Sequence, residues 1–197
     1  MPDSQPITML RGERIALGPL RRDLVETYQR WFNDLSVIRT LAAPNLPMTR
    51  EGEDAWLDIL LKERNDAVFT IYIRESGRPI GNTGLHNINQ THGTADFGIV
   101  IGEPDAWNQG YGTETARLLL NYGFDVLSLK NIMLEVQGNN PGGTRAYEKA
   151  GFKRIGVRRS ATAIGRERID AIFMDAVPED APPSDLHTLM IDGPPRG

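Results

Sequence analysis

Two closely spaced glycines, Gly110 and Gly112, lie in the segment from Trp107 to Phe124. Glycine has no Cβ, so the backbone there can turn sharply and come within hydrogen-bonding distance of a bulky ligand. Apolar residues then recur at helical spacing, which predicts an amphipathic helix directly after the loop. The first turn of a helix leaves about four N–H groups unpaired and carries a partial positive charge. The segment therefore predicts a site for a phosphate or pyrophosphate group.

Three other kinds of glycine-rich segment are compatible with part of this loop. A phosphate-binding loop of nucleoside triphosphatases needs a lysine after its last glycine, but Thr113 follows Gly112. A dinucleotide-binding fingerprint needs a third glycine and a strand–helix–strand unit with an acidic residue roughly twenty positions further on. The last alternative is a glycine-rich turn that only begins a surface helix, and the segments that follow make this alternative less favourable than an anion site.

The loop WNQGYGTETA, the strand-like IMLEVQ and the later segment NNPGGTRAYEKAGF together resemble the acetyl-CoA signature of the GNAT N-acetyltransferases. The resemblance extends from Met9 to Met174 and is specific to the RimJ/RimL-like branch, in which the loop commonly begins with tryptophan. It implies that acetyl-CoA is the acetyl donor and that the loop backbone holds the CoA pyrophosphate. The implied loop contacts are Trp107, Asn108, Gln109, Gly110, Tyr111, Gly112 and Thr113. The other implied cofactor contacts are Ile99, Val100, Ile101, Asn140, Gly143 and Tyr147.

The same resemblance implies direct transfer of the acetyl group to a primary amine. The chain has no cysteine and no clear Ser-His-Asp order, so nothing indicates a covalent intermediate. An amine with a pKa near 10.4 is almost wholly protonated at pH 7, so a base must accept its proton. Asp96 is the first candidate and Glu103 the second, and either carboxylate needs a raised pKa for this role. Tyr147 would donate a proton to the departing thiolate, while N–H groups around Val100 and Ile101 would stabilise the oxyanion.

The acceptor is the part of the reaction that the residues define least. Trp31, His86 and Asn87 are the candidates for contact with it, and it is either a small-molecule amine or a protein N-terminus. A different class of function is a non-catalytic acyl-CoA-binding module of the same fold. The presence of Asn140 and Tyr147 favours the enzyme over such a module.

Several of these candidates also have a purely structural explanation. Trp31 falls on an apolar helix face and suits a core position. Asn140 precedes Pro141, so it suits the N-cap of a helix. Tyr147 lies close to two helical turns further on and suits a buried core position, whereas Asp96 suits the solvated face of a strand.

The resemblance and the residue patterns predict an α/β fold. We expect a single GNAT-like domain with a mixed, mostly antiparallel sheet of about seven strands and helices on both faces. In the helix that follows Thr49, Ala55 and Ile59, with the nearby Trp56 and Leu60, are expected to form a buried stripe. The domain is expected over residues 8–177, with a flexible arm at 1–7 and a Pro-rich tail at 178–197 that has little fixed structure. The predicted strands lie at residues 14–20, 67–74, 79–88, 94–102 and 131–137, and a closing hairpin lies at 153–177.

Composition limits the other functions. The chain has 197 residues, of which 40% are hydrophobic and 24% charged, which is typical of a globular protein with one full core. A net charge of -4 argues against a nucleic-acid-binding protein, and no stretch approaches the length of a membrane span. The three histidines are too scattered for a metal site. We expect a cytoplasmic protein, monomeric or homodimeric, that needs no metal, no nucleic acid and no membrane.

Overall fold

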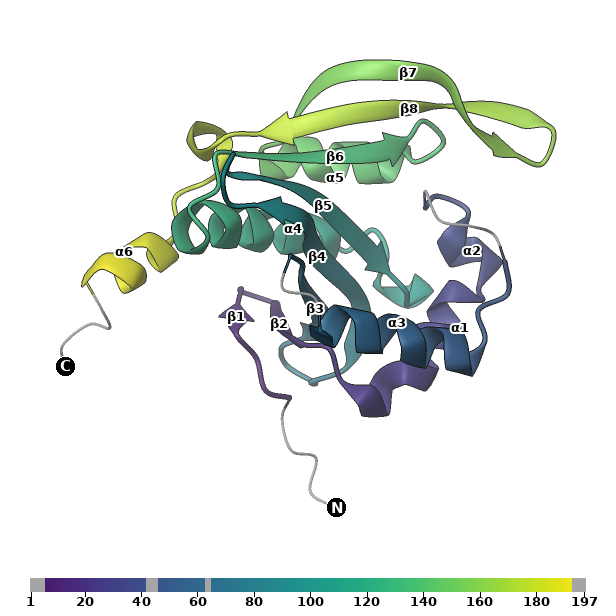
Figure 1. Cartoon of the computed structure of the whole chain (residues 1–197), viewed down its shortest axis with the longest axis horizontal. Helices are drawn as coiled ribbons and strands as arrows, with labels where there is room; N and C mark the ends of the chain where they lie inside the picture. Colours follow the sequence, from purple (N-terminus) through teal and green to yellow (C-terminus); the bar gives the residue numbers. More distant parts are fainter. Residues whose placement is uncertain (1–5, 42–45, 63–64, 193–197) are drawn as a thin grey trace.

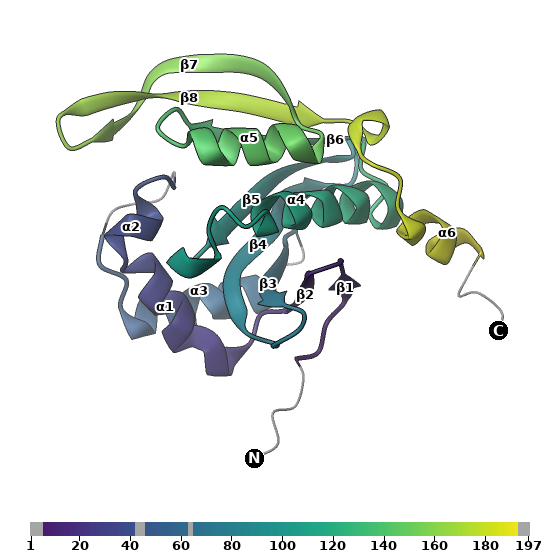
Figure 2. The same cartoon turned by 180° about the vertical axis from the view of Figure 1, so that it is seen from behind.

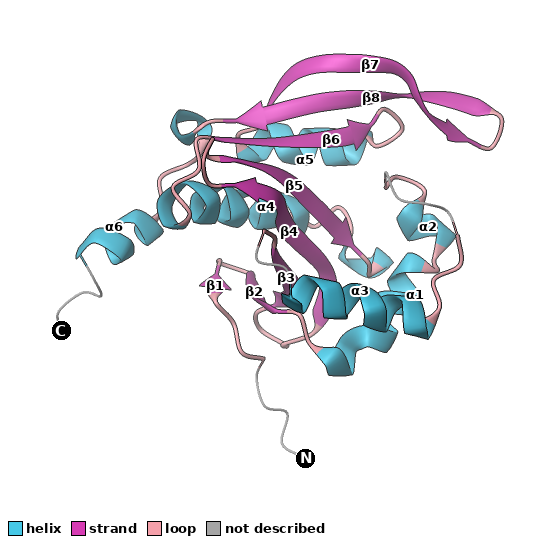
Figure 3. Ribbon diagram, in the orientation of Figure 1, coloured by secondary structure: helices cyan, strands magenta, loops and turns pink. Residues whose placement is uncertain are grey.

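The computed structural model describes residues 6–41, 46–62 and 65–192. These residues form an eight-stranded sheet with helices packed on both of its faces (Figure 1, Figure 3). The strand order is β1-β2-β3-β4-β5-β6-β8-β7. The α/β fold expected from the sequence is confirmed, and the sheet has one more strand than the seven expected. The extra strand, β1, has only two residues, too few to show an alternating pattern in the sequence.

The elements follow one another in the order expected from the sequence. The strands are β1 (Leu10–Arg11), β2 (Ile15–Pro19), β3 (Ala67–Ile73), β4 (Pro79–Asn89), β5 (Thr94–Ile101), β6 (Asn131–Gln137), β7 (Lys153–Ile164) and β8 (Glu167–Ala176). The helices and helical turns are η1 (Arg22–Leu24), α1 (Val25–Phe32), α2 (Leu35–Ile38), α3 (Arg50–Lys62), η2 (Pro104–Ala106), α4 (Tyr111–Asn121), η3 (Tyr122–Val126), α5 (Pro141–Ala150), η4 (Pro178–Asp180) and α6 (Asp185–Asp192). None of these described helices is long and apolar enough to cross a membrane.

Neighbouring strands are antiparallel throughout the sheet except for β5 and β6. These two strands pair in parallel over a short stretch only, Thr94–Asp96 against Asn131–Met133. Beyond Asp96, β5 stays paired with β4 as far as Ile101, and β6 stays paired with β8 as far as Gln137. The two strands therefore diverge (Figure 1), and their facing edges have no partner strand among the described residues.

The main core lies between the sheet and α4, which together with α5 covers one face (Figure 2). Leu119 and Leu120 of α4 are fully buried in the same cluster as Leu17, Ile71 and Leu85 from the sheet. Burial of a leucine side chain contributes about 1.5 to 3 kcal/mol. This packing fixes the start of α4, and with it the glycine loop, relative to β5.

Helices α1 and α3 lie on the opposite face of the sheet (Figure 1). The prediction of a buried stripe in α3 is wrong for Ala55 and Ile59, which are exposed, while Trp56 and Leu60 are half-buried. Glu53 and Leu57 are buried in place of Ala55 and Ile59. The pair Ala55 and Ile59 and the pair Glu53 and Leu57 have the same helical spacing. The apolar pattern favoured the first pair, because it does not reveal a buried face that includes a carboxylate.

The chain from Pro178, for which the sequence predicts little fixed structure, forms η4 and α6. Asp180 accepts a hydrogen bond from Lys153 at 2.5 Å, and Ser184 Oγ donates to Asp125 at 2.7 Å. These contacts attach the C-terminal segment to the rest of the domain. Most of the arm expected at residues 1–7 lies outside the described residues, as do the last five residues of the tail at 178–197.

Candidate active site

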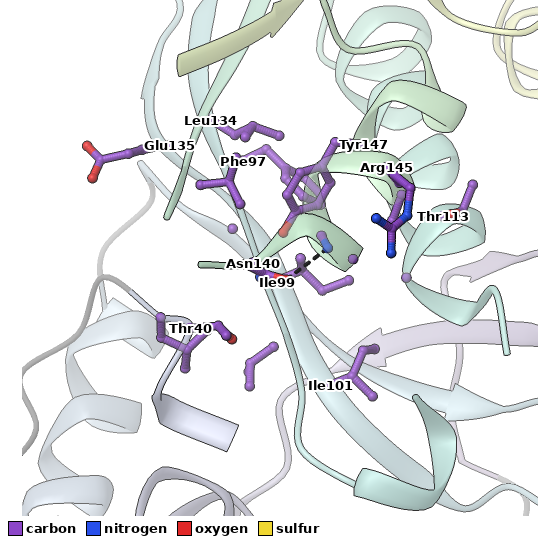
Figure 4. Close-up of a pocket in the computed structure, with 18 of the residues that line it drawn as sticks. Thr40, Phe97, Ile99, Ile101, Thr113, Leu134, Glu135, Asn140, Arg145 and Tyr147 are labelled. Atoms are coloured by element: carbon purple, nitrogen blue, oxygen red, sulfur yellow. Dashed lines mark hydrogen bonds between the residues drawn. The ribbon is translucent and has the colours of Figure 1, made fainter. Parts of the chain in front are cut away.

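A cleft of about 1090 Å³ lies where β5 and β6 diverge. The edges of both strands line it, together with the glycine loop, the first turns of α5 and the end of α2 (Figure 4). The cleft brings together most of the residues that the sequence singled out. These are His86, Asn87, Asp96, Ile99, Val100, Ile101, Trp107, Asn108, Gly110, Tyr111, Gly112, Thr113, Asn140, Gly143 and Tyr147. Trp31, Glu103 and Gln109 are not part of its lining.

The glycine loop presents bare backbone to this cleft. Asn108 and Gly110 adopt left-handed conformations, with φ of 58° and 84°, and α4 begins immediately afterwards at Tyr111. A Cβ placed on Gly112 would have no heavy atom within 4 Å, so this position faces open space. The N-terminus of α4 therefore offers unpaired N–H groups to a bulky anion, as the sequence predicted.

The loop is held in place by an ion pair that the sequence did not indicate. Arg14 donates to the carbonyl oxygen of Gln109 at 2.8 Å, and its guanidinium pairs with Glu114 at 3.2 Å. Glu114 also accepts the backbone N–H of Arg14 at 2.8 Å. The guanidinium carbon lies 5.1 Å from the centre of the Tyr111 ring. These contacts fix the loop and the first turn of α4 to the start of β2.

Trp107 acts as a second anchor for the loop. Its indole Nε1–H donates to the carbonyl oxygen of Ile101 at 2.8 Å, at the end of β5. The neighbouring Gln109 donates its side-chain amide to the carbonyl oxygen of Asp105 and so turns away from the cleft. Trp107 thus lines the cleft while its polar atom holds the loop, which explains why a tryptophan suits this position.

Asn140 has the capping role that the sequence left open. Its Oδ1 accepts the N–H of Gly143 at 2.8 Å (dashed line in Figure 4). A Cβ placed on Gly143 would lie 2.7 Å from Asn140 Nδ2, so only glycine fits beside this cap. The side-chain oxygen of Asn140 is occupied by the cap, and its amide nitrogen remains free to donate to a ligand in the cleft.

Tyr147 projects from α5 into the same cleft, and its hydroxyl points toward Asn140 and Ile99 (Figure 4). Its ring packs edge-on against Phe97 and Phe152, with centroid distances of 5.8 Å and 6.1 Å. Burial raises the pKa of Tyr147 to about 12. The phenol therefore stays protonated at neutral pH and can act as a hydrogen-bond donor.

Ile99, Val100 and Ile101 form the cleft wall on the β5 side. They pair with Thr83, Asn82 and Gly81 of β4, and no described strand pairs with their other edge. Backbone N–H groups on an unpaired strand edge can donate to a ligand that lies along the strand. This edge can therefore bind an extended chain with amide groups, or an oxyanion that forms in the cleft.

A hydrogen-bonded cluster links Asp96 to the hairpin between β4 and β5. His86 Nδ1 lies 2.7 Å from Asp66 Oδ2, and the backbone N–H of Asn87 donates to Asp66 Oδ1 at 3.0 Å. The Asn87 side chain donates to Asp96 Oδ2 at 2.9 Å. Asn87 makes both contacts because its backbone is left-handed, with φ of 51°. Asp66 was missed in the sequence, where it stands between a helix and a strand without any motif.

Glu103 and Trp31 contact each other outside the cleft lining. Trp31 Nε1–H donates to Glu103 Oε1 at 2.9 Å, and Arg30 donates to the same oxygen. Burial by itself would raise the pKa of Glu103. The hydrogen bonds from Arg30 and Trp31 outweigh this effect, so the pKa of Glu103 lies below its ordinary value. Glu103 therefore ties α1 to the end of β5, and this geometry does not support a role as base for Glu103 or substrate contact for Trp31.

The cleft also contains charged and polar residues that were not predicted. Arg145 and Lys149 line it from α5, and Arg145 extends toward Thr113 at the start of α4 (Figure 4). Their spacing of four residues puts both cations on one side of α5. The sequence therefore contained a signal for this pair of cations. Two positive charges on one side of a helix suit the phosphate groups of a nucleotide-like ligand.

The end of α2 closes the cleft from the opposite side. Gln137 donates its side-chain amide to the carbonyl oxygen of Leu41 at 2.6 Å, and Asn139 donates to that of Arg39 at 3.2 Å. These contacts join the segment after α2 to the connection between β6 and α5. The four-residue α2 is too short to give a periodic pattern, so it was not predicted.

A sheet whose only parallel pair of strands diverges beside a glycine loop, with a protonated phenol in the gap, has the architecture of an acyl-CoA-dependent acyltransferase. Residues 14–153 match the model of the acetyltransferase (GNAT) domain family. The chain therefore belongs to the GNAT acetyltransferase family, and it is an N-acetyltransferase.

Similar proteins agree with this assignment. The chain is 30% identical over 152 residues to the uncharacterized N-acetyltransferase p20 of Bacillus licheniformis, an alignment that covers 76% of this chain and 85% of that protein. It is 29% identical over 144 residues to the spermidine N(1)-acetyltransferase of Escherichia coli, with coverage of 73% and 75%. Among solved structures, the spermidine N-acetyltransferase of Vibrio cholerae, in complex with CoA and spermine, superposes with a TM-score of 0.78 at 21% identity and covers 85% of this chain and 97% of that one. The last comparison shows the shared fold.

Proposed function

We propose that this chain transfers an acetyl group from acetyl-CoA directly to a primary amine, as a member of the RimJ/RimL-like branch. One observation carries the proposal: the exposed backbone at Gly112, the unpaired edge of β5 and the hydroxyl of Tyr147 all line a single cleft. The pyrophosphate would lie at the glycine loop and the cations of α5 would face the phosphates. The pantetheine arm would then lie along β5, with the thioester between the diverging strands.

The residues of the cleft suggest how each bond of the transfer forms or breaks and where the protons go. The neutral amine attacks the thioester carbonyl carbon, a C–N bond forms, and backbone N–H groups from Ile99 to Ile101 stabilise the oxyanion. The C–S bond then breaks and the thiolate leaves. A thiol has a pKa of about 8.5, well below the value of about 12 for Tyr147. Tyr147 therefore stabilises the thiolate by donating a hydrogen bond, while the proton that completes CoA comes from the attacking nitrogen.

The charges in the cleft suggest the class of acceptor. In the half of the cleft away from α5, the described lining contains two carboxylates, Asp96 and Glu135, and one guanidinium, Arg39. Glu135 points away from the centre of the cleft (Figure 4). A polyamine, with several ammonium groups, is bound best by several carboxylates that face it. Asp96 is the one carboxylate of this described lining that is left to face the acceptor, which suits an acceptor with a single ammonium group. We therefore expect a monoamine to react faster than spermidine.

The cofactor site is tested by thermal unfolding with and without acetyl-CoA. At about a hundred times the dissociation constant a ligand adds roughly 2.7 kcal/mol, which raises the midpoint by about 5 to 10 °C for a chain of this size. Gly112→Trp should abolish the rise because it fills the open space at the loop. Gly156→Trp is the matched control, since a Cβ there also meets nothing within 4 Å and lies on β7 away from the cleft. No rise in the wild type contradicts the proposal.

The transfer itself is tested by release of CoA in an acceptor screen. The panel contains hexylamine, spermidine and a short peptide with a free N-terminus, with the same peptide acetylated at its N-terminus as the control. Release that depends on a free amine supports direct transfer to that acceptor. Stabilisation by acetyl-CoA with no release from any amine would support a binding module without catalysis.

A further inference from the structure

The hairpin of β4 and β5 forms part of the cleft wall, and there the imidazole of His86 lies against Gly84 and Gly98. His86 pairs with Asp96 in the sheet and Gly84 pairs with Gly98, and residues two apart on a strand share a face. A Cβ placed on Gly84 would lie 3.0 Å from His86 Nε2, and one on Gly98 would lie 3.4 Å from it. The Nε2 edge of the ring therefore occupies the space that both glycines leave open.

Asp66 determines which ring nitrogen carries the proton. Its Oδ1 accepts the backbone N–H of Asn87 at 3.0 Å, and its Oδ2 lies 2.7 Å from His86 Nδ1. An ionised carboxylate only accepts hydrogen bonds, so Nδ1 must be the donor. In the neutral imidazole the lone pair is then on Nε2, and Nε2 has no hydrogen-bond partner among the described residues.

We propose that His86 Nε2, oriented by Asp66, is the base that accepts the proton of the acceptor ammonium. This assignment rests on the proposed function and completes it. Nε2 takes a proton from the ammonium and becomes part of an imidazolium, and the neutral amine attacks the thioester. The C–N bond forms, the C–S bond breaks, the second nitrogen proton passes to the sulfur, and the imidazolium releases its proton to solvent. The products are the amide and CoA.

The surrounding charges agree with this role better than with the alternative base, Asp96. Asp96 already accepts a hydrogen bond from Asn87 at 2.9 Å, whereas His86 Nε2 is free. The other charged groups that line this part of the cleft are Arg39 and Glu135. Asp66 contacts the ring at Nδ1, and Asp96 is the cross-strand neighbour of His86. A negative charge beside the ring favours the imidazolium that forms when Nε2 accepts a proton.

The kinetic test compares His86→Gln and Asp66→Asn with His92→Gln, a control in the exposed turn outside the cleft lining. CoA release with hexylamine is measured from pH 6.5 to 10. General-base catalysis contributes about 100-fold or more, so His86→Gln should lower kcat/KM by about 100-fold at pH 7. The deficit should shrink as pH rises, because the neutral fraction of the amine grows about tenfold per pH unit up to its pKa near 10.4. His92→Gln should match the wild type.

A long-range ¹⁵N–¹H NMR experiment tests the tautomer without any acceptor. The resonances of His86 are identified as those absent from His86→Gln. We expect protonated Nδ1 and unprotonated Nε2 at pH 8 in the wild type, and loss of that preference in Asp66→Asn. Protonated Nε2 in the wild type would overturn the assignment.

The outcomes separate this assignment from the proposed function. If acetyl-CoA stabilises His86→Gln as it does the wild type, and activity is lost mainly at low pH, the assignment is supported. Unchanged kinetics in His86→Gln, or an equal loss at every pH, would overturn the assignment and leave the acetyltransferase function intact. Failure of acetyl-CoA to stabilise the wild type would overturn the proposed function itself, and the assignment with it.

Discussion

The cleft has two halves that are built in different ways. The cofactor half consists of the glycine loop, α4 and α5, and several of its polar contacts join residues close in the chain, such as Asn140 with Gly143 three positions later. The acceptor half consists of the end of α2 and the hairpin of β4 and β5, with α1 and α3 outside the lining. Its contacts join distant residues, such as Gln137 with Leu41, 96 positions apart. A local contact follows from residue spacing, and a distant one requires the fold.

The two halves, with the elements next to them, also differ in how well buried polar groups are paired. Next to the acceptor half, in α3, β3 and β4, Glu53 Oε1, Tyr72 Oη and both side-chain amide atoms of Asn82 are buried without a hydrogen-bond partner among the described residues. Gln137 Oε1 and Asn139 Oδ1, where β6 leads into α5, are in the same state, and within α4 and α5 Thr115 Oγ1 is the one such atom among the described residues. An unpaired buried polar group lowers stability by about 1 to 3 kcal/mol. The elements next to the acceptor half therefore carry more unfavourable free energy than α4 and α5, and substitutions there should change stability as well as function.

The largest effect is expected from Tyr147→Phe in the cofactor half. Loss of the hydrogen bond to the thiolate should lower kcat by about 100-fold, while acetyl-CoA affinity changes by less than about threefold. Steady-state kinetics and thermal shift with acetyl-CoA measure the two quantities. Because the pKa of Tyr147 is raised to about 12, its hydroxyl does not titrate between pH 6 and 10. Tyr122→Phe is the control, since Tyr122 is a core residue beside Phe69. Equal losses of kcat and affinity would contradict the proposed role.

The next effect is a pH-dependent change in stability from Glu53→Gln next to the acceptor half. Burial, with a contribution from the charge of Asp54, raises the pKa of Glu53 from 4.5 to about 7. Between these two pKa values the folded protein holds a proton that the unfolded chain releases, so the contribution of Glu53 to stability is fully present below pH 4.5 and is lost as pH rises through about 7. At about 1.36 kcal/mol per pKa unit, the loss is about 3 kcal/mol. Denaturant unfolding at pH 5 and pH 8 should show this loss in the wild type and not in Glu53→Gln.

The exposed Glu51 provides the control for this experiment. It lies in the same first turn of α3, so Glu51→Gln removes a similar charge near the helix N-terminus without changing a buried group. We expect Glu51→Gln to keep the wild-type dependence on pH. If Glu53→Gln also kept that dependence, the buried carboxyl would not be its source.

A smaller effect is expected from alanine at two adjacent positions in α5. A Cβ on Gly143 would lie 2.7 Å from Asn140 Nδ2, whereas on Gly142 it would lie 3.9 Å from the nearest atom, Asn140 Oδ1. Gly143→Ala should displace the cap and lower stability by about 1 kcal/mol, with weaker binding of acetyl-CoA. Gly142→Ala should raise stability by about 0.5 to 1 kcal/mol, because alanine favours the helix. Equal effects at both positions in urea unfolding would show that the cap at Asn140 does not matter.

The smallest effect is expected from Gln137→Ala, which removes the hydrogen bond to Leu41. One such bond contributes about 1 kcal/mol, so KM for the amine should rise by about fivefold while stabilisation by acetyl-CoA stays the same. Gln109→Ala is the control, because the side chain of Gln109 bonds to Asp105 four positions earlier and lies outside the cleft lining. A change in acetyl-CoA affinity without a change in amine KM would show that this contact belongs to the cofactor half instead.

The sequence alone determined the backbone features of the cofactor half and the order of the main elements, but not the contacts of Arg14 that hold the glycine loop. Glycines followed by an apolar stripe predicted the loop and α4, and Asn140 before Pro141 predicted the start of α5. These features depend on backbone conformation and on contacts within one or two turns, which residue type and spacing largely set. The comparisons with known proteins then confirmed the family that this half of the chain resembles.

Only the tertiary structure decided the acceptor half. Glu103 looked like a base but lies against Arg30 and Trp31, while Asp66, which carries no motif, orients His86. In the cofactor half, the ion pair of Arg14 with Glu114 joins residues 100 positions apart and was likewise not indicated by the sequence. Each of these contacts joins side chains from separate elements, and only the packing of helices on the sheet and the register of its strands bring them together. The spacing of residues along the chain does not show how these elements pack.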